Sequence, residues 1–298
     1  MNDIELSAKY FLEDLGINTY PIDPFEICES LGIEIFEAPF DGLEGVLLFN
    51  GQNAKIGLDS KQTYLPRRKF SVSHELGHFN NDVSFGELKA FRCTKNMIGD
   101  NSNQTTDIEA RADKFASEIL LPNFLIKDLF NYHEPSWDII KEVSSKFEVS
   151  LLSTIFKYIE KSKAACCLVV SKNNMIQFYK PSKTFRYSLQ MNESRVLSDF
   201  SYASKAMKGL EINNDFELLS ADTWISGVNV TKDSELYEWS MPLNSHDQVL
   251  TLLWDDETVN QADYEDNSNN PYDIEEKNYS YGGVDNFPWE PPTFGKKK

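Results

Sequence analysis

Apolar residues in the first part of the chain alternate between helical and strand spacing. Residues 3–16 place apolar side chains on one helical face, and Gly16 ends the pattern. Residues 21–32 predict a second short helix, and residues 33–38 alternate as a strand. Residues 44–59 contain two apolar runs around Asn-Gly-Gln-Asn, which predicts a β-hairpin. The first sixty residues therefore predict two helices followed by a small sheet.

Helical spacing dominates the next hundred residues. We expect a helix over 66–80, then a polar and irregular stretch over 81–105 that forms a loop or a small insertion. Residues 106–121 form a clear amphipathic helix that Pro122 closes. Its apolar face comprises Ala112, Phe115, Ala116, Ile119 and Leu120. Two further helices are predicted at 136–147 and 150–161, and their few basic residues favour simple packing over DNA reading.

The pattern becomes strand-rich after residue 163. Residues 164–179 predict two strands around an Asn-Asn turn, and further strands are expected at 215–221 and 248–254. We therefore expect an α+β protein. Its domains would be an N-terminal domain of helices plus a small sheet (1–163), a mixed, strand-rich C-terminal domain (164–254) and an acidic, partly docked tail (255–298).

Charge and composition narrow the function classes. The net charge is −18, and residues 255–290 contain eleven acidic residues against one lysine. This balance argues against direct nucleic-acid binding, which requires a basic face. No signal peptide or membrane-spanning run is visible, and four cysteines make no disulfide framework. We therefore expect a soluble cytoplasmic protein with reduced cysteines.

The segment Ser-His-Glu-Leu-Gly-His suggests a metal centre. His74 and His78 are four residues apart on a predicted helix, so both imidazoles can point at one zinc ion. Glu75 is rotated by about 100° from His74. It can therefore act as a general base on a water at the metal's open position. Such a pattern would arise by chance in a chain of this composition with a probability of about 0.004.

A catalytic zinc needs a third protein ligand. His133 and His246 have no ligand-like spacing, whereas Glu109 and Asp113 share one face of the 106–121 helix. Glu109 could bind the metal while Asp113 accepts the other ring N–H of a ligating histidine. Alternatively, Glu109 could cap its own helix with Thr106, and Asp113 could lie on a solvated face beside Arg111. The residues alone leave these interpretations open.

The segments "HELGH" and "EARADKFASEILLP" together resemble the ImmA/IrrE family of zinc metallo-endopeptidases, which are gluzincin-like zincins. The resemblance covers roughly residues 1–160. The matching positions in the second segment are Glu109, Ala112, Asp113, Phe115, Ala116, Leu120, Leu121 and Pro122. The resemblance implies one zinc ion held by His74, His78 and Glu109, with Glu75 as the general base. Members often have a second acid where this chain has Arg111.

The resemblance also implies a function. The substrate would be a protein, specifically a helix-turn-helix transcriptional repressor of phage, mobile-element or stress regulation. Residues 54–59 would be an edge strand along which an extended peptide lies. Gly77 would allow close packing against another backbone. A rival hypothesis is a regulatory protein that binds a repressor or toxin without cutting it, with a structural or vestigial zinc site.

Overall fold

The computed structural model describes residues 3–84, 88–94, 105–130, 134–190, 195–226, 230, 234–243 and 248–256; for residues 92–94, 105 and 106 it describes the backbone only. The described chain divides into two compact units. The first lies within residues 1–128 and 141–154, and the second lies within 129–140 and 155–270. The fold is α+β, as predicted, with a strand-rich C-terminal part. The boundary expected at residue 163 stays a prediction, and most of the acidic tail lies outside the described residues.

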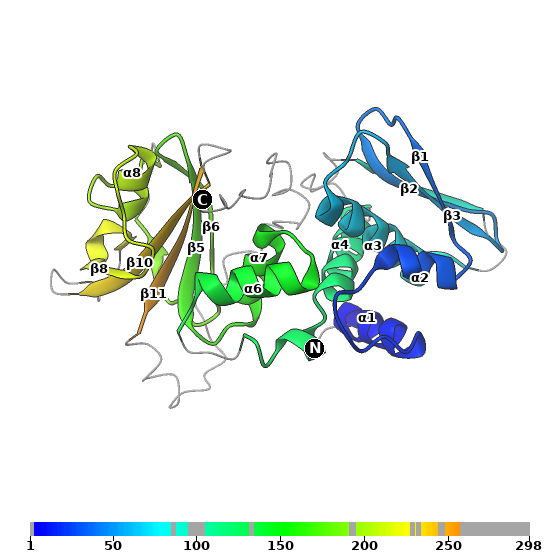
Figure 1. Ribbon diagram of the computed structural model, residues 1–298, viewed down its shortest axis with the longest axis horizontal. Coiled ribbons are helices and arrows are strands. Elements are labelled where there is room, and N and C mark those ends of the chain that lie inside the picture. The colour runs from blue at the N-terminus through cyan, green and yellow to red at the C-terminus, as the bar shows by residue number, and fades with distance from the viewer. Residues whose placement is uncertain are drawn as a thin grey trace, which may run out of the picture. The chain divides into compact units, whose positions relative to one another are not determined.

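The first unit combines helices with a four-stranded sheet (Figure 1). Its helices are α1 (Asp3–Asp14), α2 (Pro24–Ser30), α3 (Leu65–Asn81), α4 (Thr105–Leu120) and α5 (Asn123–Ile126). Its strands are β1 (Glu34–Ala38), β2 (Leu43–Phe49), β3 (Ala54–Asp59) and β4 (Lys89–Thr94). Helices α6 (Trp137–Phe147) and α7 (Leu151–Lys161) follow, and each contributes residues to both units.

The order of strands in this sheet is β1-β3-β2-β4. β1 and β3 are parallel, whereas β2 is antiparallel to both of its neighbours. The predicted hairpin is therefore present as β2 and β3. Of the two alternatives for 81–105, a simple loop is wrong, because the stretch contains β4. The expectation that residues 54–59 are an edge strand is also wrong. β3 is paired on both sides, so β1 and β4 are the edges among the described strands.

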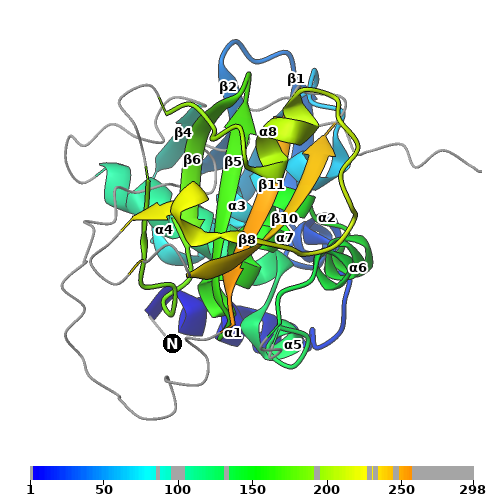
Figure 2. The same cartoon turned by 90° about the vertical axis from the view of Figure 1, so that its left-hand side faces the viewer.

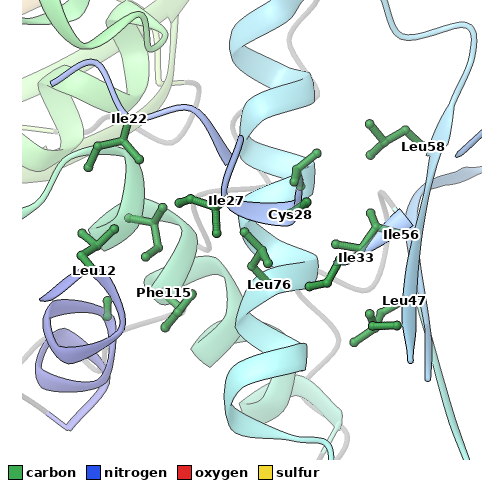
Figure 3. Close-up of a cluster of buried hydrophobic side chains, with 14 of the residues drawn as sticks. Leu12, Ile22, Ile27, Cys28, Ile33, Leu47, Ile56, Leu58, Leu76 and Phe115 are labelled. Carbon is green, nitrogen blue, oxygen red and sulfur yellow. The ribbon is translucent and has the colours of Figure 1, made fainter. Parts of the chain in front are cut away.

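Helix α3 is the centre of the first unit. Pro66 occupies its first turn, where a missing backbone N–H costs nothing. Its apolar residues Val72 and Leu76 are fully buried in a cluster that joins α1, α2, α4 and the sheet (Figure 3). Burying a leucine of this kind stabilises the fold by about 1.5–3 kcal/mol. Packing against several elements therefore holds α3 in place independently of any metal.

The second unit is an antiparallel sheet in the order β6-β5-β11-β10-β8 (Figure 2). Its strands are β5 (Ala165–Lys172), β6 (Met175–Pro181), β8 (Glu217–Ser220), β10 (Glu235–Leu243) and β11 (Gln248–Asp255). Helix α8 (Tyr202–Met207), the 3-10 turn η1 (Ala221–Thr223) and the short strands β7 (Ser188–Leu189) and β9 (Ile225–Ser226) complete it.

Strand β10 has no counterpart among the predicted strands. Its sequence is difficult to recognise because Glu238 occupies an inward, fully buried position. Its carboxylate accepts hydrogen bonds from Trp224 Nε1 (2.6 Å), the backbone N–H of Ala203 (2.6 Å) and Ser240 Oγ (2.8 Å). Ser240 is close in the sequence, whereas Trp224 and Ala203 come from other elements, and together they satisfy a polar group that the local pattern places inside.

Candidate metal centre

The sequence His-Glu-x-x-His lies in the middle of α3, where the helix is buried. His74 and His78 are 5% and 0% exposed, and Glu75 is 0% exposed. Both histidines project from the same face because they are one turn apart. Their ring centroids are 4.8 Å apart, and the two Nε2 atoms are 3.1 Å apart. The predicted convergence of two imidazole nitrogens is therefore present in the fold.

Helix α4 brings Glu109 and Asp113 to the same histidines. This is possible because α3 and α4 pack with almost no space between their backbones. A Cβ atom on Gly77 would lie 3.1 Å from Ala112 Cα and 3.3 Å from Phe115 Cβ. Gly77 therefore allows the close backbone packing expected from the sequence, and this packing determines how near Glu109 comes to the histidines.

The Glu109 carboxylate contacts both imidazoles. Its Oε2 lies 3.2 Å from His74 Nε2, and its Oε1 lies 3.4 Å from His78 Nε2. All three side chains are buried, and their ligand atoms lie within 4.8 Å of one another. Burial alone would raise the pKa of Glu109, but hydrogen bonds and charge interactions with His74 and His78 in their protonated forms lower it from 4.5 to about 2. The cluster therefore favours an ionised carboxylate.

The outer nitrogen of each histidine faces another carboxylate. His74 Nδ1 is 2.8 Å from Asp113 Oδ1, and His78 Nδ1 is 3.0 Å from Asp82 Oδ2. A carboxylate oxygen accepts a hydrogen bond at this position, so in the neutral form, the form that can bind a metal, each imidazole would carry its proton on Nδ1. Both Nε2 lone pairs then point toward the Glu109 carboxylate. Three electron-pair donors at this spacing are stabilised by a cation between them.

These distances fit a divalent zinc ion. Bonds of about 2.0–2.1 Å at tetrahedral angles place neighbouring ligand atoms about 3.3 Å apart. The two Nε2 atoms are 3.1 Å apart, and each is approached by a different oxygen of Glu109, His74 by Oε2 at 3.2 Å and His78 by Oε1 at 3.4 Å, so each of these contacts is close to that spacing. Two nitrogens and one carboxylate are also a donor set that zinc binds in catalytic sites, where a fourth position stays open. Among the described residues, His74, His78 and Glu109 could therefore hold the metal.

Glu75 directly follows His74 in α3, and its carboxylate lies against Gly45 of strand β2. If Gly45 had a Cβ atom, that atom would lie 2.5 Å from Glu75 Oε1. The space for the Glu75 carboxylate therefore depends on the absence of a side chain at position 45. The sequence contains no local signal for this contact, because thirty residues separate the two positions.

Two residues of the site were not identified from the sequence. Asp82 lies four positions after His78, at the end of α3, and this spacing could have indicated it. Phe91 of β4 stacks on the His78 ring, with centroids 4.4 Å apart and planes 10° from parallel. Phe91 was not identified, because its stretch of chain was expected to be a loop or a small insertion and no strand was predicted there.

The alternatives considered for α4 have different outcomes. Asp113 is 2% exposed, so it does not lie on a solvated face. Arg111 contacts Asp82 and not Asp113, with Arg111 Nη2 2.7 Å from Asp82 Oδ1. The Thr106 side chain that would complete a capping box lies outside the described residues, as do His133 and His246. Glu109 itself lies among the histidines.

Comparisons with known proteins give one informative result. Residues 28–157 match a family model described as the IrrE N-terminal-like domain of Peptidase M78. One solved structure, a Mycobacterium tuberculosis transcriptional regulator, is similar with a TM-score of 0.49 and 11% identity, over 88% of this chain and 78% of that chain. A similarity of this size supports no argument about function. No curated protein matches the chain.

The matched segment begins at Cys28 and ends at Lys157. It includes α3, α4 and all four strands of the first sheet, so it contains every residue of the cluster described above. Residues 28–157 of this chain are therefore an IrrE N-terminal-like domain of the Peptidase M78 family.

Proposed function

We propose that the chain is a zinc-dependent endopeptidase that cleaves a protein substrate in the cytoplasm. The observation on which this rests is the convergence of His74, His78 and Glu109 at separations of 3.1–3.4 Å, with both outer imidazole nitrogens facing carboxylates. The match of residues 28–157 to a peptidase family supports the same conclusion. One zinc ion per chain would be held by these three side chains.

A zinc ion in such a site polarises a carbonyl oxygen and lowers the pKa of water to about 7. Within the chain, Glu75 would be the general base. It follows His74 directly in α3, so it points about 100° away from the face of the two histidines and would not be a metal ligand. In this position it would accept a proton from the attacking water and later donate it to the leaving amine. Asp113 would hold the proton of His74 on Nδ1 and orient that ring.

We propose that the substrate peptide binds in an extended form along β4. This strand is an edge of the sheet among the described strands, and its Phe91 contacts the His78 ring. An extended peptide can add to such an edge through backbone hydrogen bonds, with its side chains giving specificity. This assignment replaces residues 54–59, which are paired on both sides.

The identity of the substrate rests on the family resemblance. We propose a helix-turn-helix transcriptional repressor, cleaved in phage, mobile-element or stress regulation. The strand-rich second unit would recognise a partner or sense a signal. No helix among the described residues has the length and apolar character to cross a membrane.

The experiment replaces Glu75 with glutamine. Purified full-length chain is incubated with a candidate repressor encoded beside it, and the products are identified by mass spectrometry. Glu75→Gln should keep its zinc, measured by elemental analysis, and should lower the cleavage rate by about 10²–10⁴-fold, the usual contribution of a general base. Glu142→Gln, which changes an exposed glutamate of α6, is the matched control.

Two results would contradict the proposal. Cleavage that survives in Glu75→Gln would exclude the proposed mechanism. A wild-type chain that binds the repressor and releases it from its operator as well as Glu75→Gln does, without any cut product, would instead favour the rival regulatory binding function.

A further inference from the structure

Asp82 connects three elements at the end of α3. Its backbone N–H donates to the His78 carbonyl over 2.9 Å, which closes the last turn of the helix. Its own carbonyl accepts a hydrogen bond from Lys89 Nζ of β4 over 2.6 Å. The backbone of Asp82 is thus attached both to the helix that presents the histidines and to the edge strand beside it.

The side chain of Asp82 connects His78 to α4. Asp82 Oδ2 lies 3.0 Å from His78 Nδ1, and Asp82 Oδ1 accepts a hydrogen bond from Arg111 Nη2 over 2.7 Å. The Asp82 side chain is only 7% exposed, whereas that of Arg111 is 47% exposed. Arg111 therefore reaches in from the surface and holds a buried carboxylate in one orientation.

This arrangement fixes the His78 ring on three sides. Phe91 stacks on its face, Asp82 accepts at Nδ1, and Nε2 points toward His74 and Glu109. A carboxylate at Nδ1 places the proton there, leaves the lone pair on Nε2 and makes that nitrogen a stronger ligand. His74 has a separate partner in Asp113, so the two histidines are oriented independently.

We infer that Asp82 is a positioning residue for His78, and that Arg111 supports it by holding the Asp82 carboxylate. The inference rests on the proposed function, because the purpose of orienting His78 is metal binding. It assigns a role to Arg111, whose guanidinium contacts the Asp82 carboxylate. Neither residue would touch the substrate.

The test measures zinc binding and the His78 tautomer in the full-length chain, without any cleavage assay. The variants are Asp82→Ala, Asp82→Asn and Arg111→Met. The control is Lys9→Met, which removes an ion pair between Lys9 and Glu13 on α1. Zinc dissociation constants come from competition with a chromophoric chelator. The tautomer comes from nitrogen-15 NMR of the histidine rings in metal-free protein.

Removal of a carboxylate behind a zinc-ligating histidine typically weakens metal binding about 10–100-fold. We expect Asp82→Ala to show a loss of this size and a mixture of His78 tautomers. Asp82→Asn keeps an acceptor at Nδ1, so it should recover part of the affinity. Arg111→Met should lose less than Asp82→Ala, and Lys9→Met should match the wild type. Thermal melting in the presence of a chelator verifies that each variant is folded.

The inference is overturned if folded Asp82→Ala keeps the Nδ1–H tautomer of His78, or if it binds zinc within twofold of the wild type. Failure of the proposed function gives a different result. A wild-type chain that cuts no peptide, while Asp82→Ala still shows the tautomer change and the weaker zinc binding, would leave this inference intact.

Discussion

Glu75 and Gly45 illustrate how single residues in this site depend on one another. The Glu75 carboxylate is fully buried against β2, in space that is open only because residue 45 has no side chain. The contacted atom is the far end of a flexible side chain. A methyl group at position 45 would therefore displace the carboxylate without requiring the backbone to move.

We predict that Gly45→Ala lowers peptide cleavage by at least about tenfold while leaving zinc affinity and melting temperature close to wild-type values. The reason is that a general base must lie within hydrogen-bond reach of the proton it abstracts. Steady-state cleavage kinetics, chelator competition and thermal melting test the three parts. A large loss of zinc affinity would show that the substitution disturbs the ligands instead of Glu75.

At the scale of single residues, part of the candidate site could be proposed from the sequence. His74, Glu75 and His78 are local in sequence, and helical geometry alone brings the two imidazoles together. Whether Glu109 caps its helix or approaches the histidines could not be decided from its own segment. That choice depends on a neighbouring helix, and the sequence pattern does not give the distance between helices.

At the scale of elements, the contact between α3 and α4 sets the distance between Glu109 and the two histidines. Gly77 allows Ala112 of α4 to approach closely, and Glu109 and Asp113 lie on either side of Ala112 in sequence. A Cβ atom at position 77 would lie 3.1 Å from Ala112 Cα and 3.3 Å from the Ala112 carbonyl oxygen, so a side chain larger than alanine there would press on the backbone of α4. The distance between Glu109 and the histidines should therefore change with the size of residue 77.

We predict that Gly77→Val lowers both thermal stability and zinc affinity, because it separates α3 from α4. Overpacking of this kind costs about 1–3 kcal/mol. Gly57→Ala is the control. A Cβ atom there would lie within 2.6–2.9 Å of Phe36, Val46 and Phe40 in the sheet. It should lower the melting temperature with little change in zinc affinity. Equal zinc affinity in both variants would contradict the proposed coupling.

Elements with an uninterrupted local pattern were predicted well. The helices α3 and α4 and the β2–β3 hairpin follow the expected segments. The sequence did not predict β4, because its residues are stabilised by pairing with β2 and by the Phe91 contact with His78. β10 was missed for a related reason, since a buried Glu238 interrupts its apolar pattern.

At the scale of the whole molecule, the three candidate metal ligands His74, His78 and Glu109 all belong to the first compact unit. The described part of the second unit has its own buried cluster, including Val169, Trp224 and Leu253. A ligand stabilises only the part of a protein whose folded form binds it. The two units should therefore respond differently when zinc is added.

We predict that zinc slows amide hydrogen exchange in α3 and α4 and leaves β5 and β11 unchanged. Zinc at one hundred times its dissociation constant should stabilise the first unit by about 2.7 kcal/mol. Hydrogen-exchange mass spectrometry with and without zinc measures both units in one sample. Equal protection of β5 and β11 would show that the units unfold together.

The sequence by itself determined which side chains can bind a metal and how they are arranged along each helix. Helical periodicity places His74 beside His78 and Glu109 beside Asp113, and both relations are local. Only the tertiary structure decided that these two pairs meet, that Gly45 makes space for Glu75, and that Asp82 and Arg111 lie behind His78. These contacts join residues on different elements, and their distances depend on how the helices and the sheet pack, which no local pattern specifies.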